Sequence, residues 1–263
     1  MSEASASRRP PATGSEPVRP GAWQNSAVTI PNTIFPPARV YAVEITGAEL
    51  VTPRMHRIHL AGPDLVGFTA IPGQDVVVHL RTPTGPAHRR YTIRNLDAAS
   101  GSLDLDVVLH GHGPGARWAE AAQPGESLEI FGPRGKVPLA PAARQVFVGD
   151  ESAIPAIAEM AAALPPSTEI TAIIEIADAA ERQPLPPAVD VRWLVRDGRE
   201  PGTAELLAPA LDEIALPDAD RHLYVFAESR VVRALRDLLL AKGVGPAEIS
   251  AKGYWNKGRA MRG

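Results

Sequence analysis

Hydrophobic and polar residues alternate along much of the segment from residue 39 to about residue 131. In the clearest case, residues 103–109, leucine or valine takes every second position, with Asp104 and Asp106 between them. This period of two is typical of a strand with one buried face. Similar short apolar segments lie at 43–45, 56–60 and 76–80. Many short strands separated by glycine and proline turns predict a small antiparallel β-barrel over residues 39–140.

From residue 141 onward, short uninterrupted apolar segments alternate with segments of helical spacing. The spacing predicts helices over 153–164 and 231–239. The apolar segments are predicted strands at 146–148, 170–176, 191–195 and 223–227. Strands that alternate with helices favour a mostly parallel sheet with helices on its faces. We therefore predict an α/β nucleotide-binding domain over residues 141–263, following the barrel.

Residues 1–38 are rich in Pro, Ser, Ala and Arg and show no sustained period. They are predicted to be a disordered arm, in which only Trp23 and Phe35 offer large side chains for docking. No apolar run approaches the ~20 residues of a membrane helix, and no hydrophobic segment of a secretory signal follows Met1. We expect a cytoplasmic monomer.

Composition narrows the possible chemistry. The 263 residues include no cysteine, which excludes disulfides, cysteine nucleophiles and cysteine-ligated iron–sulfur clusters. Redox chemistry would therefore need a bound organic cofactor. The net charge of -3 gives no general basic field for nucleic acid.

The first motif that suits ligand binding is Arg-Arg-Tyr-Thr-Ile-Arg at 89–94. Tyr91 offers an aromatic wall for a ring system, and Thr92 offers hydrogen bonds along its edge. Arg90 and Arg94 share a strand face with Thr92 and are placed to clamp phosphate. Alone, the motif is also compatible with an exposed arginine-rich strand.

A second motif, at 110–119, follows a predicted strand and opens a predicted helix. Its glycines allow close backbone approach, and a helix N-terminus presents free N–H groups to phosphate. An ordinary glycine-rich turn would have the same sequence pattern. His110 and His112 raise the question of a metal, but no supporting cluster of carboxylates and histidines is present, so we predict no metal site.

Two further segments lie near strand ends. Asp150, Glu151 and Ser152 follow the first strand of the α/β half, where ligands bind in such sheets, although helix capping explains them equally well. The tail 252–259 places Tyr254 and Trp255 among cations, which suits stacking on a flavin or adenine ring. A terminal strand packed against the body is the alternative for the tail.

Taken in order, these segments resemble the siderophore-interacting protein family of FAD-binding ferric-siderophore reductases, which is related to ferredoxin-reductase-type flavoproteins. The resemblance covers residues 40–260 and is carried by RRYTIR, HGHGPGARWA, FGPRG, GDESAIPAI and KGYWNKG. It implies a barrel that binds FAD, a second domain for NADH or NADPH, and a ferric siderophore as substrate.

The resemblance also implies roles for individual residues. The flavin would be held by Arg90, Tyr91 and Thr92, with Trp255 beside it. The pyrophosphate and adenosine would be held by the loop from His110 to Trp118, which includes Gly113, Gly115 and Ala116. Asp150, Glu151 and Ser152 would lie where the domains face the flavin. An anionic siderophore would be attracted by Arg134, Lys136 and Lys252.

Some alternatives stay open. One is a flavoprotein reductase for free flavin, quinone or a protein, and another is a siderophore carrier without turnover. We predict NADH over NADPH, because Asp178 and Glu181 follow the second strand of the α/β half and would repel a 2′-phosphate. Arg196 and Arg199 leave NADPH possible, and a ferredoxin is a third candidate donor.

Overall fold

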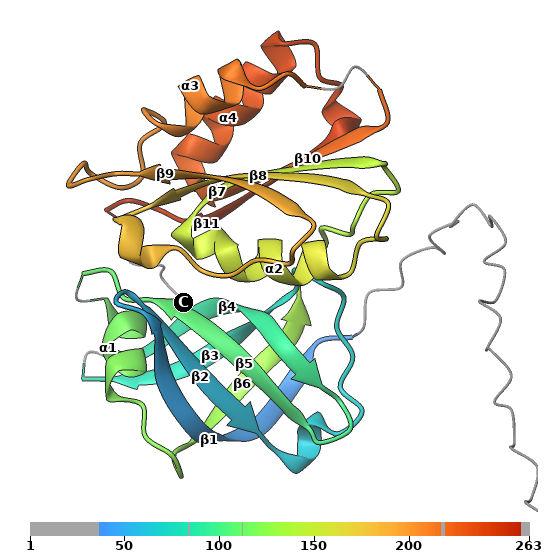
Figure 1. Ribbon diagram of the computed structural model, residues 1–263. Coiled ribbons are helices and arrows are strands. Elements are labelled where there is room, and N and C mark those ends of the chain that lie inside the picture. The colour runs from blue at the N-terminus through green and yellow to red at the C-terminus, as the bar shows by residue number, and fades with distance from the viewer. Residues whose placement is uncertain (1–36, 84, 112, 217–218, 259–263) are drawn as a thin grey trace, which may run out of the picture.

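The computed structural model describes residues 37–258, except residues 84, 112, 217 and 218. Most of the predicted arm, with Trp23 and Phe35, and also His112 lie outside the described residues. The chain forms a barrel and a sheet-containing layer that stack on each other (Figure 1). The predicted fold class, a β-barrel followed by an α/β unit, is confirmed.

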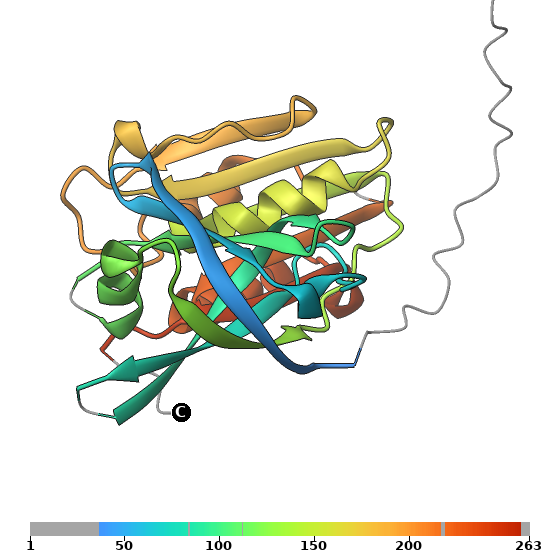
Figure 2. The same cartoon turned by 90° about the horizontal axis from the view of Figure 1, so that it is seen from below.

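Six antiparallel strands close the barrel in the order β1-β2-β5-β4-β3-β6. Their bounds are β1 Arg39–Thr52, β2 Met55–Ala61, β3 Asp75–Thr82, β4 Gly85–Asp97, β5 Ser102–Val108 and β6 Ser127–Arg134. The short helices of this half are η1, Pro63–Leu65, and α1, Pro114–Ala121. Viewed from below, β1 runs obliquely across the barrel and α1 lies at one end (Figure 2).

The alternation seen in the sequence fills the barrel. Leu103, Leu105 and Val107 of β5 point inward and are almost fully buried. They pack with inward residues from the other strands, because successive side chains of a strand point to opposite faces.

The second half is a five-stranded sheet in the order β11-β10-β7-β8-β9, with every neighbouring pair parallel. The strands are β7 Arg144–Asp150, β8 Glu169–Ile176, β9 Val189–Val195, β10 Arg221–Glu228 and β11 Ile249–Trp255. The helices are η2 Glu151–Ala153, α2 Ile154–Ala162, η3 Ala179–Glu181, α3 Leu207–Glu213, α4 Ser229–Ala241 and η4 Pro246–Glu248. None of the helices in the described part of the chain has the length and apolar character needed to cross a membrane.

The sheet separates two apolar cores. On one face, α3 and α4 cover Val146 and Val148, while on the other face α2 covers Phe147. Helix α2 therefore lies between the sheet and the barrel (Figure 1). This arrangement brings the C-terminal edge of the sheet to the mouth of the barrel, where the candidate site lies.

Candidate functional site

A pocket of about 650 Å³ opens where the barrel meets the C-terminal edge of the sheet. Cofactor pockets commonly measure roughly 300–1,000 Å³. Six parts of the chain line it: the start of strand β3, strand β4, the end of strand β5, the 110–116 segment, the helical segment after β7, and the end of β11 with the residues that follow. Ligands of open α/β sheets bind beyond the carboxyl ends of the strands, so the location agrees with that rule.

Tyr91 forms an aromatic part of the wall. Its ring stacks on that of Trp118, with 5.8 Å between the ring centroids, and burial raises its pKa. A Cβ atom added at Gly115 would lie only 2.1 Å from the Tyr91 hydroxyl oxygen. Glycine at 115 is therefore required by the close approach of Tyr91 to the first turn of α1.

Two cations share one carboxylate at the pocket wall. Arg90 donates from Nε and Nη2 to the two carboxylate oxygens of Asp75, at 2.8 and 2.7 Å. Lys252 donates to Asp75 Oδ2 at 2.8 Å. Because Asp75 is buried and two positive charges meet one negative charge, this wall carries a net positive charge toward the pocket.

The glycine-rich segment leads into α1 as the sequence predicts. Gly113 is the N-cap residue, no side chain caps the helix, and Pro114 occupies the first turn. Pro114 has no backbone N–H, so the first N–H groups of the helix are those of Gly115 and Ala116, which have no side-chain acceptor among the described residues, and Gly113, Gly115 and Ala116 border the pocket. His110 lies across the pocket edge, stacked on Trp255 with centroids 6.0 Å apart.

The tail forms strand β11, which pairs with β10 at the edge of the sheet, so its aromatic side chains belong to the body of the protein. Tyr254 is half-buried and interacts with Thr92 of the barrel, which lines the pocket and is buried. Trp255 donates from Nε1 to Asp150 Oδ2 at 2.8 Å. The predicted packing of the tail against the body is observed, and the same strand also lines the pocket.

Behind the pocket lies a buried polar cluster. Arg196 donates from Nη1 to Glu151 at 2.7 Å and to Glu175 at 3.2 Å, and also from Nη2 to Glu151. Asp150 accepts from the backbone N–H and hydroxyl of Ser152. Burial, with the nearby Glu151 charge, raises the pKa of Asp150 to about 6, and burial raises the pKa of Glu175 to about 7.

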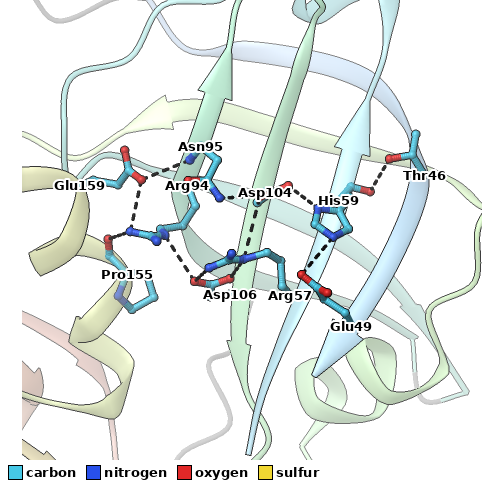
Figure 3. A network of polar contacts seen from close by, with 10 residues as sticks. All are labelled: Thr46, Glu49, Arg57, His59, Arg94, Asn95, Asp104, Asp106, Pro155 and Glu159. Atoms are coloured by element: carbon cyan, nitrogen blue, oxygen red, sulfur yellow. Dashed lines mark hydrogen bonds and ion pairs between the residues drawn. The ribbon is translucent and has the colours of Figure 1, made fainter. Parts of the chain in front are cut away.

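Arg94 lies outside the pocket lining, although it belongs to the same motif as Arg90. Its Nε lies 3.4 Å from Asp106 Oδ2, and its Nη1 lies 3.3 Å from Glu159 Oε1 and 3.4 Å from the Pro155 carbonyl oxygen (Figure 3). Pro155 and Glu159 belong to α2, so Arg94 joins barrel strand β4 to the sheet layer. Asp106 also accepts two hydrogen bonds from Arg57, at 2.6 and 2.8 Å.

The remaining predicted residues lie around the pocket in different ways. Ser152 lines it, whereas Asp150, Glu151 and Trp118 stand behind the lining residues. Arg134 and Lys136 are exposed on the barrel rim. Gly135, between them, lies near Lys252, because a Cβ atom placed there would be 3.6 Å from Lys252 Nζ.

Asp75 and Glu175 were not predicted as part of the site. Glu175 interrupts an otherwise apolar strand and Asp75 begins one, and an acid in or beside a buried strand indicates a charge that needs a partner. From the sequence, Arg196 was a candidate partner for a nucleotide phosphate. In the structure Arg196 instead donates hydrogen bonds to Glu151 and Glu175, and only 5% of its surface is exposed.

The lining suits an anionic ligand that carries aromatic rings, such as FAD. Tyr91, Tyr254 and Trp255 supply ring faces, and the glycine-rich turn with the uncapped start of α1 supplies N–H groups for phosphate. The wall of Arg90 and Lys252 supplies positive charge. The residues present therefore fit a flavin dinucleotide.

Comparisons with known proteins agree with this geometry. Residues 142–258 match the family model for siderophore-interacting protein, and residues 76–137 match the siderophore-interacting FAD-binding domain. Ferric vibriobactin reductase ViuB of Vibrio cholerae is 31% identical over 84% of this chain and 92% of the relative. The NADPH-dependent ferric-chelate reductase of Escherichia coli is 25% identical over 88% of this chain and 99% of the relative. The crystal structure of a siderophore utilization protein from T. fusca, 33% identical, covers 87% of this chain and 97% of its own, with a TM-score of 0.81.

Proposed function

The chain belongs to the siderophore-interacting protein family, and from this premise we propose that it is an FAD-dependent oxidoreductase that passes electrons from NADH or NADPH to ferric iron in a siderophore. The single observation that carries the proposal is the pocket at the junction of the two halves, walled by aromatic rings, free helix N–H groups and cations. We place the reaction in the cytoplasm and expect a monomer.

Each part of the pocket has a task in this proposal. Arg90, Tyr91, Thr92 and Trp255 hold the flavin, and the segment from His110 to Trp118 holds the pyrophosphate and adenosine. When bound, FAD accepts two electrons as hydride and passes them on singly, so the cofactor supplies the redox chemistry. The chain supplies orientation and charge. Reduction favours iron release, because ferrous iron binds hard oxygen ligands more weakly than ferric iron does.

Arg134, Lys136 and Lys252 are the proposed attraction site for an anionic ferric siderophore. Support comes from Gly135, which lies between Arg134 and Lys136 in sequence and close to Lys252 in space, and from the net positive charge around Asp75. Lys136→Glu should raise KM for the ferric chelate several-fold and leave flavin reduction by the nicotinamide unchanged. Arg233→Glu, at an exposed position of α4, makes the same change of charge far from the pocket lining; it is the matched control and should alter neither. Equal effects of both variants would contradict the assignment.

The activity itself is tested with two spectra of the purified protein. We expect flavin absorbance that bleaches under anaerobic NADH or NADPH and recovers on addition of a ferric siderophore. Recovery with quinone or free flavin but not with the siderophore would indicate a different reductase. A colourless protein that binds siderophore without binding FAD would indicate a carrier, and bleaching by reduced ferredoxin alone would indicate a protein donor.

The role of Arg90 is tested by binding. Arg90→Ala should weaken FAD binding by about 1.5–3 kcal/mol, because charge-assisted hydrogen bonds are worth roughly that much. Arg81→Ala, an exposed arginine on the neighbouring strand β3, is the control and should bind FAD normally. Equal affinities for the two variants, measured by fluorescence titration with FAD, would remove Arg90 from the cofactor site.

A further inference from the structure

Three carboxyl groups and one guanidinium meet at the C-terminal edge of the sheet. Asp150 of β7 and Glu175 of β8 are register partners on neighbouring parallel strands, so their side chains lie on the same face. Glu151 follows Asp150, and Arg196 follows β9. Asp150, Glu175 and Arg196 have only 5%, 2% and 5% of their surfaces exposed.

Full ionisation would leave this cluster with two uncompensated negative charges, and burying unpaired charge is costly. The hydrogen-bond donors are distributed unequally among the three carboxyl groups. Glu151 receives two donors of Arg196, and Asp150 receives the Ser152 N–H, the Ser152 hydroxyl and the Trp255 indole. Glu175 receives one donor at 3.2 Å, which it shares with Glu151. Glu175 is therefore the group least able to carry a charge.

We propose that Glu175 is a positioning residue that keeps a proton near neutral pH, so that Asp150 alone carries the charge that holds the Trp255 indole at the pocket wall. Glu175 is absent from the pocket lining and acts through Asp150. Trp255 lies at the wall itself, where its six-membered ring also approaches Gly202.

The other charged groups around this cluster have their own partners. On β11, Tyr254 lies between Asp150 and Asp75, and burial raises its pKa, so it stays neutral. Asp75 pairs with Arg90 and Lys252. At the end of β10, Glu228 accepts from the backbone N–H groups of residues 230, 231 and 257.

Protons leave two interacting carboxyl groups in two steps that belong to the pair. Burial raises the pKa of Asp150 to about 6 and that of Glu175 to about 7. Between these steps Asp150 is ionised and Glu175 is protonated. Below the lower step the indole loses its charged acceptor, and above the upper step a second carboxylate faces Asp150. The hydrogen bond from the Trp255 indole to Asp150 should therefore be strongest at pH values between the two steps.

The indole N–H group of Trp255 reports this directly. The chain has four tryptophans, so a ¹H–¹⁵N spectrum of the FAD-loaded protein labelled with ¹⁵N-tryptophan has few signals, and Trp255→Phe identifies the signal of Trp255. His110 stacks on the Trp255 ring, so the titration is carried out in the His110→Gln background, which removes the histidine ring from the reporter. We expect the shift of the Trp255 signal to change in two steps between pH 5 and pH 8.5. A Trp255 signal that does not change over this range would overturn the proposal.

Two variants and one control test the two titration steps separately. Glu175→Gln should abolish the upper step and keep the lower one, because glutamine imitates the protonated acid. Ser152→Ala should move the lower step to higher pH, because Asp150 loses a donor that stabilises its charge. Glu169→Gln removes an exposed carboxylate from the same strand and should change neither step. If Glu175→Gln does not fold, the number of steps in the unsubstituted cluster decides the matter, because a Glu175 that does not hold a proton would leave only the lower step.

An upper step that survives in Glu175→Gln, or a lower step that does not move in Ser152→Ala, would refute the assignment. No nicotinamide or siderophore enters this experiment. Its failure would therefore leave the proposed electron transfer standing, and failure of electron transfer would leave this result standing.

Discussion

Replacing Arg94 with methionine should loosen the connection between the barrel and the sheet layer. Methionine keeps much of the length of the side chain but removes its contacts with Asp106, Glu159 and the Pro155 carbonyl (Figure 3). Asp106 keeps its two hydrogen bonds from Arg57, so no carboxylate in the barrel is left without a partner.

The expected cost follows from the exposure of each partner. The pair with Glu159 is partly exposed, at 15% and 27% of the two side chains, and is worth about 0.5–1 kcal/mol. The pair with Asp106 is more buried, but at 3.4 Å it is an ion pair without a hydrogen bond from Arg94 Nε and is worth about 0.5–1 kcal/mol, while the long carbonyl contact adds less. The total loss should be about 1–2 kcal/mol.

Urea unfolding followed by far-ultraviolet circular dichroism and by flavin absorbance measures this loss. The matched control is Arg192→Met, whose partner is Glu213 and whose pair is exposed at 46% and 61% of the side chains, so it should lose less than about 1 kcal/mol. Arg94→Met should also separate the two transitions, because Arg94 joins the two halves and Arg192 does not. Equal losses, with coincident transitions in both variants, would refute the reasoning.

Three other predictions follow from the site. Gly115→Ala should displace Tyr91 and lower FAD content, because its Cβ would lie 2.1 Å from the Tyr91 hydroxyl, and normal flavin absorbance would contradict the packing. Stability to urea should fall by about 1–3 kcal/mol between pH 5 and pH 8 through Asp150 and Glu175, because their folded pKa values are raised to about 6 and about 7 and stability from such groups is lost as pH rises through those values. Glu175→Gln should lose part of this pH dependence, and an unchanged profile would contradict it. NADH should reduce the flavin faster than NADPH in stopped-flow experiments, since Arg196 is committed to Glu151 and Glu175, and faster reduction by NADPH would reverse this preference.

Local pattern predicted the secondary structure well where one face of an element is buried. The alternation at 103–109 is strand β5, and the helical spacing near 231–239 lies within α4. Both patterns arise because side chains on one face of an element pack into one core. The spacing of apolar residues that results can be recognised within a few consecutive residues.

Contacts between residues that lie on different elements could not be predicted in this way. Periodicity places Arg90 and Arg94 on one face of β4, but only the folded chain brings Glu159 to Arg94 and Asp75 to Arg90. The same limit applies to Arg196, whose partners come from β8 and from the segment after β7. Such pairings depend on how the strands are ordered in the sheet. The spacing of apolar residues along a single element does not determine that order.

The position of strand β11 has a consequence for how the protein is made. Residues 249–255 are synthesised after the other strands that the structure describes, yet they bring Lys252 to Asp75 and Trp255 to Asp150 at the pocket. On the ribosome, the barrel can complete its six strands while one wall of the pocket is still missing. Stable capture of the cofactor therefore has to wait until β11 has left the exit tunnel, and nascent chains that stop short of β11 would lack a finished pocket.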